Sequence, residues 1–262
     1  MRIIISPAKK MKPDTDVFTS RQMPQFINES EILLATLKKL NYEEAKSLWK
    51  CNDAITTLNA QRIENMDLTR NLVPALFAYE GIQYQYMAPG VLQTEELEYL
   101  QQHLRILSGF YGILRPFDGV VPYRLEMQAK LAGPGFSSIY GFWGRKLADQ
   151  LLAESGCILN LASKEYSKCI SPYLGRDVRM VTCVFGQHIG GKVIEKSTLV
   201  KMARGEMVRF MAERQIRCVE DIKGFTGFDF EFVDELSNES TYVFIQKVTK
   251  TGGNKVCTGT GN

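Results

Sequence analysis

The chain has 262 residues, of which 45% are hydrophobic and 23% are charged. These proportions are typical of a globular domain and exclude a disordered or fibrous protein. Lys and Arg number 32 against 29 for Asp and Glu, a formal net charge of only +3. Any site for an anion must therefore be a local cluster rather than a property of the whole surface.

The amino-terminal segment and the cysteines predict a cytoplasmic protein. Residues 1–6 lack the apolar core of a secretory signal. The longest nearly apolar stretch, 72–79, is less than half of the roughly 18 residues that suggest a membrane span, so we expect no membrane partner. The six cysteines include no Cys-x-x-Cys pair, and the two histidines lack metal-ligand spacing. We therefore expect reduced thiols, no metal site and no cofactor.

The first half of the chain is predicted to contain two strands and four helices. The β-branched run 3–5 favours a buried strand. Leucines at helical spacing predict three helices between residues 28 and 66, the second of them capped by Asn41. A strand is expected over 76–79. A helix with acidic residues in its first turn is expected over 94–107.

The second half is predicted to alternate between helices and strands. A helix is expected over 142–153, a strand over 157–161 and a β-hairpin over 177–195. A long helix follows over 198–214, and two terminal strands are expected over 228–232 and 242–248. No linker or repeat interrupts this alternation. We therefore predict a single compact α/β domain over 1–250 with a mixed β-sheet, with two domains as the alternative. A flexible tail is expected over 251–262.

Residues 104–127 combine glycines, prolines, aromatic rings and charges more densely than the rest of the chain. Gly109 and Gly112 would let the backbone approach an anion, and consecutive N–H groups would add their dipoles there. Following a helix, such a turn predicts a helix-hairpin-helix-like element that binds phosphate, with Arg115 as a forked donor. The alternative is an ordinary helix C-cap with Gly109 in the left-handed conformation.

The helix expected over 198–214 is the second candidate anion site. Lys201, Arg204 and Arg209 share one arc of this helix, opposite an apolar arc. Gly205, at the centre of the basic arc, would let a phosphate backbone come close, and each neutralised phosphate would add affinity through counterion release. A solvated helix face is the alternative interpretation.

The loop that follows the first strand is the third candidate. Lys9 and Lys10 lie just beyond the strand's carboxyl end, which is where α/β proteins often bind ligands. Lysines are also the commonest residues of surface loops. This segment therefore gains significance only if the other two basic segments lie beside it.

Acid and base chemistry has one candidate pair. Asp118 and Glu126 flank Pro122-Tyr123-Arg124 and would suit general acid and base work on a sugar or a base. The equally simple interpretation is that they form structural ion pairs with neighbouring arginines.

Five segments, in this order along the chain, resemble the bacterial YaaA family: residues 5–9, 104–127, 142–144, 160–166 and 201–210. The pieces Ser-Gly-x-Tyr-Gly-x-Leu-Arg-Pro and Pro-Tyr-Arg-Leu-Glu-Met are the most distinctive. The resemblance implies an unusual α/β topology with a helix-hairpin-helix-like element and a positively charged cleft that binds duplex DNA. It also implies a role in peroxide stress resistance that keeps reactive iron low.

The resemblance assigns residues to this cleft. The expected cleft cations are Lys9, Arg115, Arg124, Lys201, Arg204 and Arg209, and the hairpin includes Ser108, Gly109, Tyr111 and Gly112. Lys10 departs from the family pattern, in which many members have a threonine, but as a basic neighbour of Lys9 it is also expected at the DNA. We therefore expect a cytoplasmic protein that binds double-stranded DNA by shape and phosphate contacts and limits iron-dependent oxidative damage. The alternative is an enzyme acting on a nucleobase or nucleoside through Asp118 and Glu126. A small anionic ligand in the cleft is compatible with both hypotheses.

Overall fold

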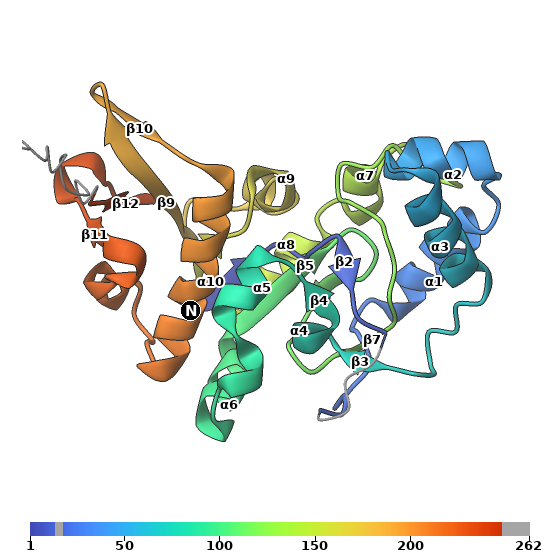
Figure 1. Ribbon diagram of the computed structural model, residues 1–262, viewed down its shortest axis with the longest axis horizontal. Helices are drawn as coiled ribbons and strands as arrows, with labels where there is room; N and C mark the ends of the chain where they lie inside the picture. The colour runs from blue at the N-terminus through green and yellow to red at the C-terminus, as the bar shows by residue number, and fades with distance from the viewer. Residues whose placement is uncertain (14–17, 248–262) are drawn as a thin grey trace, which may run out of the picture.

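The computed structural model describes residues 1–13 and 18–247, which form helices packed around a central mixed sheet (Figure 1). The eight strands are β1 (Arg2–Ile5), β5 (Leu104–Ser108), β6 (Gly112–Leu114), β8 (Cys157–Leu161), β9 (Arg179–Ile189), β10 (Lys192–Ile194), β11 (Phe230–Phe232) and β12 (Thr241–Gln246). Their order is β11-β12-β9-β8-β1-β5-β6, with β10 paired to β9. The predicted α/β class and mixed sheet are confirmed. The tail predicted at 251–262 lies outside the described residues.

Strand β1 lies between β5 and β8 in a run of five parallel strands with the order β12-β9-β8-β1-β5. Ile3 pairs with Leu104 of β5 on one side and with Leu159 of β8 on the other, and residues 3–5 are fully buried. A strand covered on both faces favours such a β-branched run. The chain leaves β1 to build β5 on one side and later returns to build β8 on the other. In α/β sheets this reversal opens a crevice at the carboxyl ends of the two strands.

The three helices expected between residues 28 and 66 are present and gather at one end of the molecule (Figure 1). They are α1 (Ile27–Leu37), α2 (Tyr42–Trp49) and α3 (Asp53–Glu64). Asn41 caps α2 as predicted, because its side chain accepts the N–H of Glu44 while the Glu44 carboxylate accepts the N–H of Asn41. The helix expected over 142–153 is divided into α7 (Ile139–Trp143) and α8 (Lys146–Glu154). Gly144, with φ of +48°, ends α7.

Short elements complete the described part of the chain. They are β2 (Lys10–Met11), β3 (Val73–Pro74), α4 (Ala75–Ala78), β4 (Tyr79–Glu80), β7 (Gly119–Val120), α9 (Lys164–Ser167) and the 3₁₀ helices Pro89–Val91, Ser171–Tyr173, Val219–Gly224, Gly227–Asp229 and Asp234–Leu236. The prediction of a strand over 76–79 is therefore wrong. That apolar stretch forms α4, and only its last residue enters a strand, which pairs with β2. In the described residues, no helix is both long enough and apolar enough to cross a bilayer.

The segment expected to form a helix-hairpin-helix-like element forms a β-hairpin instead. Helix α6 (Thr94–His103) ends before Leu104, and β5 and β6 pair antiparallel through the turn 109–111. A Cβ atom on Gly109 would lie 2.5 Å from the backbone oxygen of Leu125. Glycine is therefore needed here because the chain's own backbone, not a phosphate, passes over it. Pairing with β1 decides the strand conformation of 104–108, which apolar spacing alone does not reveal.

Helix α10 (Ser197–Glu213) has the predicted extent but packs on two sides. One side faces β9, and the other lies against α5 (Ile82–Met87), a helix that the sequence did not predict (Figure 1). A Cβ on Gly205 would lie 2.1 Å from the backbone oxygen of Gln83 and 2.9 Å from the backbone nitrogen of Met87. Gly205 thus permits close helix packing. The expectation that it admits a phosphate is wrong.

Candidate anion-binding pocket

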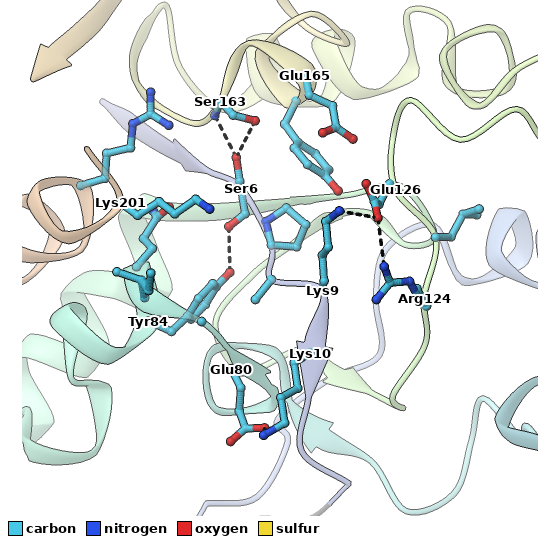
Figure 2. Close-up of a pocket in the computed structure, with 18 of the residues that line it drawn as sticks. Ser6, Lys9, Lys10, Glu80, Tyr84, Arg124, Glu126, Ser163, Glu165 and Lys201 are labelled. Carbon is cyan, nitrogen blue, oxygen red and sulfur yellow. Dashed lines mark hydrogen bonds and ion pairs between the residues drawn. The ribbon is translucent and has the colours of Figure 1, made fainter. Parts of the chain in front are cut away.

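A cavity of about 410 Å³ lies at the carboxyl ends of β1 and β8 (Figure 2). Its floor includes Ser6, which follows β1, and Ser163, which follows β8. The backbone N–H of Ser163 donates to the Ser6 hydroxyl oxygen at 2.8 Å, and the two hydroxyls lie 3.2 Å apart. Tyr84 of α5 donates its hydroxyl to the Ser6 carbonyl oxygen at 3.1 Å. These bonds fix the two strand ends and α5 relative to one another.

Three basic segments that are distant in the sequence meet at this pocket. Its basic lining residues are Lys9, Lys10, Arg124, Lys201 and Arg204. The topology explains the convergence. The loop after β1, the segment after β7 and one arc of α10 all reach the crevice predicted between β1 and β8. The structure therefore brings five of the expected cations to one pocket.

Most of the cations at the Glu126 end of the pocket are already paired. The Glu126 carboxylate lies 2.9 Å from Lys9 Nζ and 3.5 Å from Arg124 Nη2 (Figure 2). Lys10 pairs with Glu80 at 2.9 Å. The lining contains five basic side chains against three carboxylates, so the pocket has a surplus of two positive charges.

The unpaired cations lie on α10. In residues 1–13 and 18–247, no carboxylate lies within 4.0 Å of the charged atoms of Lys201 or Arg204. Burial lowers the pKa of Arg204, and the more distant Glu195 partly offsets that effect. Arg204 is half-buried and its Nε is fully enclosed. Such a guanidinium without a counterion is costly, which indicates a place for a negatively charged ligand.

Three buried donors on the pocket lining have no hydrogen-bond partner among the residues that the structure describes: Gln83 Nε2, Arg124 Nε and Arg204 Nε. Buried polar atoms are almost always hydrogen-bonded, so an unpartnered group needs an explanation. Each of these atoms can only donate. The pocket is therefore suited to a ligand rich in acceptor oxygens.

Two further residues of the pocket were missed by sequence reasoning. Glu165 lies just after β8 and lines the same cavity as Glu126 (Figure 2). Burial raises the pKa of Glu165, the N–H of Gln128 at 3.2 Å opposes this rise, and the nearby Glu126 carboxylate adds to it. Gln83 lies on the unpredicted helix α5. Residues 160–166 belonged to the family resemblance, but nothing in their spacing indicated chemistry.

A buried hydroxyl cluster supports the segment that carries Arg124 and Glu126. The Tyr123 hydroxyl is hydrogen-bonded to the Ser108 hydroxyl at 2.6 Å and to the Tyr79 hydroxyl at 2.8 Å. Burial raises the pKa of Tyr123 to about 12, so this phenol stays neutral. Ser108, Gly109, Tyr111 and Gly112 are all buried and do not line the pocket. These hairpin residues were expected to contact DNA. Instead they are buried, and Ser108 helps to hold Tyr123, the residue before Arg124.

Arg115 and Asp118 lie in a separate surface hollow, away from Glu126. Asp118 is 2% exposed and accepts the Arg115 N–H at 2.8 Å and the Gln22 side-chain amide at 2.6 Å. Burial raises the pKa of Asp118 to about 6. The expected pairing of Asp118 with Glu126 is therefore wrong, because Asp118 closes a local turn. Arg115 approaches Glu154 at 3.9 Å instead of the pocket.

Arg209 is the other expected cleft cation that lies outside the pocket. It lies on α10, as Lys201 and Arg204 do, but pairs with Glu213 at 2.7 Å, an (i, i+4) contact along the same helix. The predicted basic arc of α10 therefore has two parts. Lys201 and Arg204 line the pocket, whereas Arg209 forms a local ion pair outside it.

The fold and the pocket define a class of protein. It is an α/β protein with a mixed sheet and a cationic ligand pocket at the ends of two parallel strands. The chain belongs to the YaaA family, since the model described as peroxide stress protein YaaA matches residues 1–236. This membership supports a role in peroxide stress.

Relatives cover almost the whole chain. A UPF0246 protein of Lachnoclostridium phytofermentans is 55% identical over 246 residues, which is 94% of this chain and 96% of the relative. A UPF0246 protein of Pediococcus pentosaceus is 49% identical over 246 residues, 94% of this chain and 98% of the relative. One from Desulfitobacterium hafniense is 50% identical over 250 residues, 95% of this chain and all of the relative.

Proposed function

We propose that this peroxide stress protein binds double-stranded DNA at the mouth of the pocket and thereby limits iron-dependent oxidative damage to DNA. The observation that carries the proposal is the convergence of basic residues from three distant segments on one pocket. The Lys9 and Lys10 side chains are 65% and 77% exposed, and Lys201 is also exposed. Lysines at an open rim can contact phosphates without desolvating the duplex.

Phosphate contacts rather than base contacts fit the surroundings of α10. A recognition helix needs a free face to enter the major groove. Helix α10 lies against α5 on one side and faces β9 on another. We therefore infer that binding follows the shape and charge of the duplex.

Salt dependence tests the proposal. We expect affinity for a labelled duplex to fall steeply with salt, with a slope of roughly −0.9 per phosphate contact in a plot of log affinity against log salt. Lys201→Ala should flatten the slope by about one contact. Arg209→Ala is the matched control, because Arg209 lies on the same helix outside the pocket, and its slope should equal that of the unmodified protein. Equal slopes for all three proteins would contradict the proposal.

A second candidate function is an enzyme that acts on a nucleobase or nucleoside. The observation that favours it is a pair of carboxylates with different surroundings in one pocket. Glu126 is held by Lys9 and Arg124, whereas burial raises the pKa of Glu165. Such a difference separates acid and base roles. Glu165 would donate a proton to the departing base, and Glu126 would accept a proton from the water that replaces it at the sugar carbon.

Glu165→Gln separates the two candidates. If the protein hydrolyses nucleosides, the change should lower release of free base at least about 100-fold, because the proton donor is lost. The rate of the unmodified protein should fall as pH rises through the raised pKa of Glu165, since the acid is then ionised. Chromatography of nucleosides incubated with the protein measures both effects. Absence of free base with the unmodified protein removes this second function, whereas duplex binding by the variant should be unchanged if the protein only binds.

A further inference from the structure

We propose that the end of the pocket nearest α10 and α5 binds the phosphate of a small phosphomonoester of nucleotide size, such as a nucleoside monophosphate. The inference rests on the proposed function, because both use one pocket, and it names the ligand class that the inner end takes. The lysines at the rim serve the duplex, and Lys201 is the one of them that also lines the inner end of the pocket. Arg204 and Gln83, which are less exposed, are not needed for contact with a duplex.

Three donors meet where α10 crosses α5. Lys201 and Arg204 are one turn apart on α10, and both line the pocket. Gln83 on α5 is held beside them, because its backbone oxygen packs onto Gly205, the residue after Arg204. Figure 2 shows the Lys201 side chain directed toward Ser6 at the end of β1. The close helix crossing thus places two cations and an amide at one subsite.

The chemistry of these groups defines the ligand atoms. Gln83 is 7% exposed, and its side-chain nitrogen has no partner, as is also true of the Arg204 Nε. Amide and guanidinium nitrogens donate only, so the ligand must present several acceptor oxygens. A phosphate has three terminal oxygens that can accept such bonds, and arginine's planar fork matches them.

The charge of the subsite separates a phosphomonoester from other anions. Lys201 and Arg204 account for the surplus of two positive charges in the pocket. A phosphomonoester carries about −1.5 to −2 at pH 7, because its second pKa is about 6. A carboxylate or a phosphodiester carries only one negative charge. The dianion therefore fits the subsite best.

The volume of the cavity indicates how large a group is attached to the phosphate. A volume of about 410 Å³ lies within the range of roughly 300–1,000 Å³ for small-molecule sites and exceeds what one phosphate fills. Beyond the subsite the lining includes the apolar Pro7 and Ile82 and the ion pair of Arg124 with Glu126. Such a wall suits a ring with polar substituents. A nucleoside attached to the phosphate meets both requirements.

Thermal unfolding with defined probes tests the inference. The probes are adenosine 5′-monophosphate, inorganic phosphate, cyclic adenosine 3′,5′-monophosphate and adenosine. At about 100 times its Kd, adenosine 5′-monophosphate should raise Tm by roughly 5 to 10 °C. Inorganic phosphate should displace it. The cyclic diester should bind at least about tenfold more weakly, because it carries one charge, and adenosine should produce no shift.

Arg204→Met localises the site. Without ligand, its Tm should equal or exceed that of the unmodified protein, because the change removes a buried charge that has no counterion. With adenosine 5′-monophosphate, the shift in Tm should disappear. Lys201→Met should weaken binding at least about fivefold. Because Lys201 is exposed, this variant should fold normally, so it tests the site even if Arg204→Met does not fold. Arg209→Met is the matched control and should retain the full shift.

The outcomes distinguish this inference from the proposed function. No shift with adenosine 5′-monophosphate or phosphate overturns the inference even if the duplex binds. A shift that persists in both Arg204→Met and Lys201→Met overturns the location, and equal affinity for the cyclic diester overturns the preference for a dianion. A shift with the monophosphate but no salt-dependent binding of duplex supports the inference and removes the proposed function.

Discussion

Gly205→Ala should destabilise the protein by about 2–3 kcal/mol in urea unfolding. The added Cβ would lie 2.1 Å from the backbone oxygen of Gln83, and a backbone atom cannot yield as the end of a flexible side chain does. The sign of the effect is diagnostic. Within an unpacked helix the same change would stabilise by about 1 kcal/mol, because alanine has the higher helix propensity.

Gly224→Ala is the control for this change. In the described part of the chain, no atom beyond its two sequence neighbours lies within 4 Å of a Cβ at Gly224, so the free energy of unfolding should change by less than about 0.5 kcal/mol. We also expect Gly205→Ala to weaken binding of adenosine 5′-monophosphate, since it would force Gln83 away from Arg204. A stabilised Gly205→Ala variant would show that α10 and α5 do not pack as described.

Glu154→Ala should lower the free energy of unfolding by about 3–5 kcal/mol at pH 7. Glu154 accepts the Nε–H of Arg105 at 2.8 Å and that of Arg2 at 2.6 Å. The Arg105 side chain is only 3% exposed, so loss of the carboxylate leaves a buried guanidinium without its counterion. Arg2 is less buried and can turn toward water. Chemical denaturation at fixed pH measures the loss.

The paired change Arg105→Met with Glu154→Met is the control for this prediction. Replacing both charges with apolar groups of similar volume is often neutral, so the double variant should recover most of the loss. If it is as unstable as Glu154→Ala, packing rather than the unpaired charge is responsible.

The same ion pair predicts a pH dependence. Burial opposes ionisation of Glu154, but hydrogen bonds from Arg105, Arg2 and Gln150 outweigh it, so the pKa of Glu154 is lowered. A carboxyl group whose pKa is lower in the folded state stabilises the fold above its unfolded pKa of about 4.3. That contribution is lost as pH falls through the folded pKa. Between about pH 5 and pH 3, the unmodified protein should therefore lose more stability than the double methionine variant.

Local sequence patterns correctly predicted the elements whose conformation depends mainly on their own residues. The isoleucines of β1, the capping residue Asn41 and the long amphipathic α10 were all predicted, as was the β9–β10 hairpin. Each has a short-range signal such as β-branching, a cap or helical spacing. The pairing of β1 with β5 has none, because its partners are about a hundred residues apart. The helix predicted through 104–107 was wrong for that reason.

Only part of the candidate site could be predicted, because residue spacing shows local placement but not contacts between distant segments. Four of the five expected cations at the pocket, Lys9, Lys10, Lys201 and Arg204, lie in or just after correctly predicted elements. Arg115 does not line the pocket, because its side chain approaches Glu154, a residue distant in the sequence. Arg209 does not line it either, because it pairs with Glu213, an (i, i+4) partner that residue spacing could have indicated. Glycines were the most misleading signal. Gly109 and Gly205 do allow a close backbone approach, but the approaching backbone belongs to this chain.

The position of β1 between β5 and β8 has a consequence for the order of assembly. Strand β1 leaves the ribosome before both of its neighbours, which are completed only at Ser108 and Leu161. Closing such long loops costs entropy before the contacts are gained, which slows folding. A nascent chain released before Ser163 would lack one wall of the pocket, so the pocket is completed late in synthesis although Lys9 and Lys10 are made before its other walls.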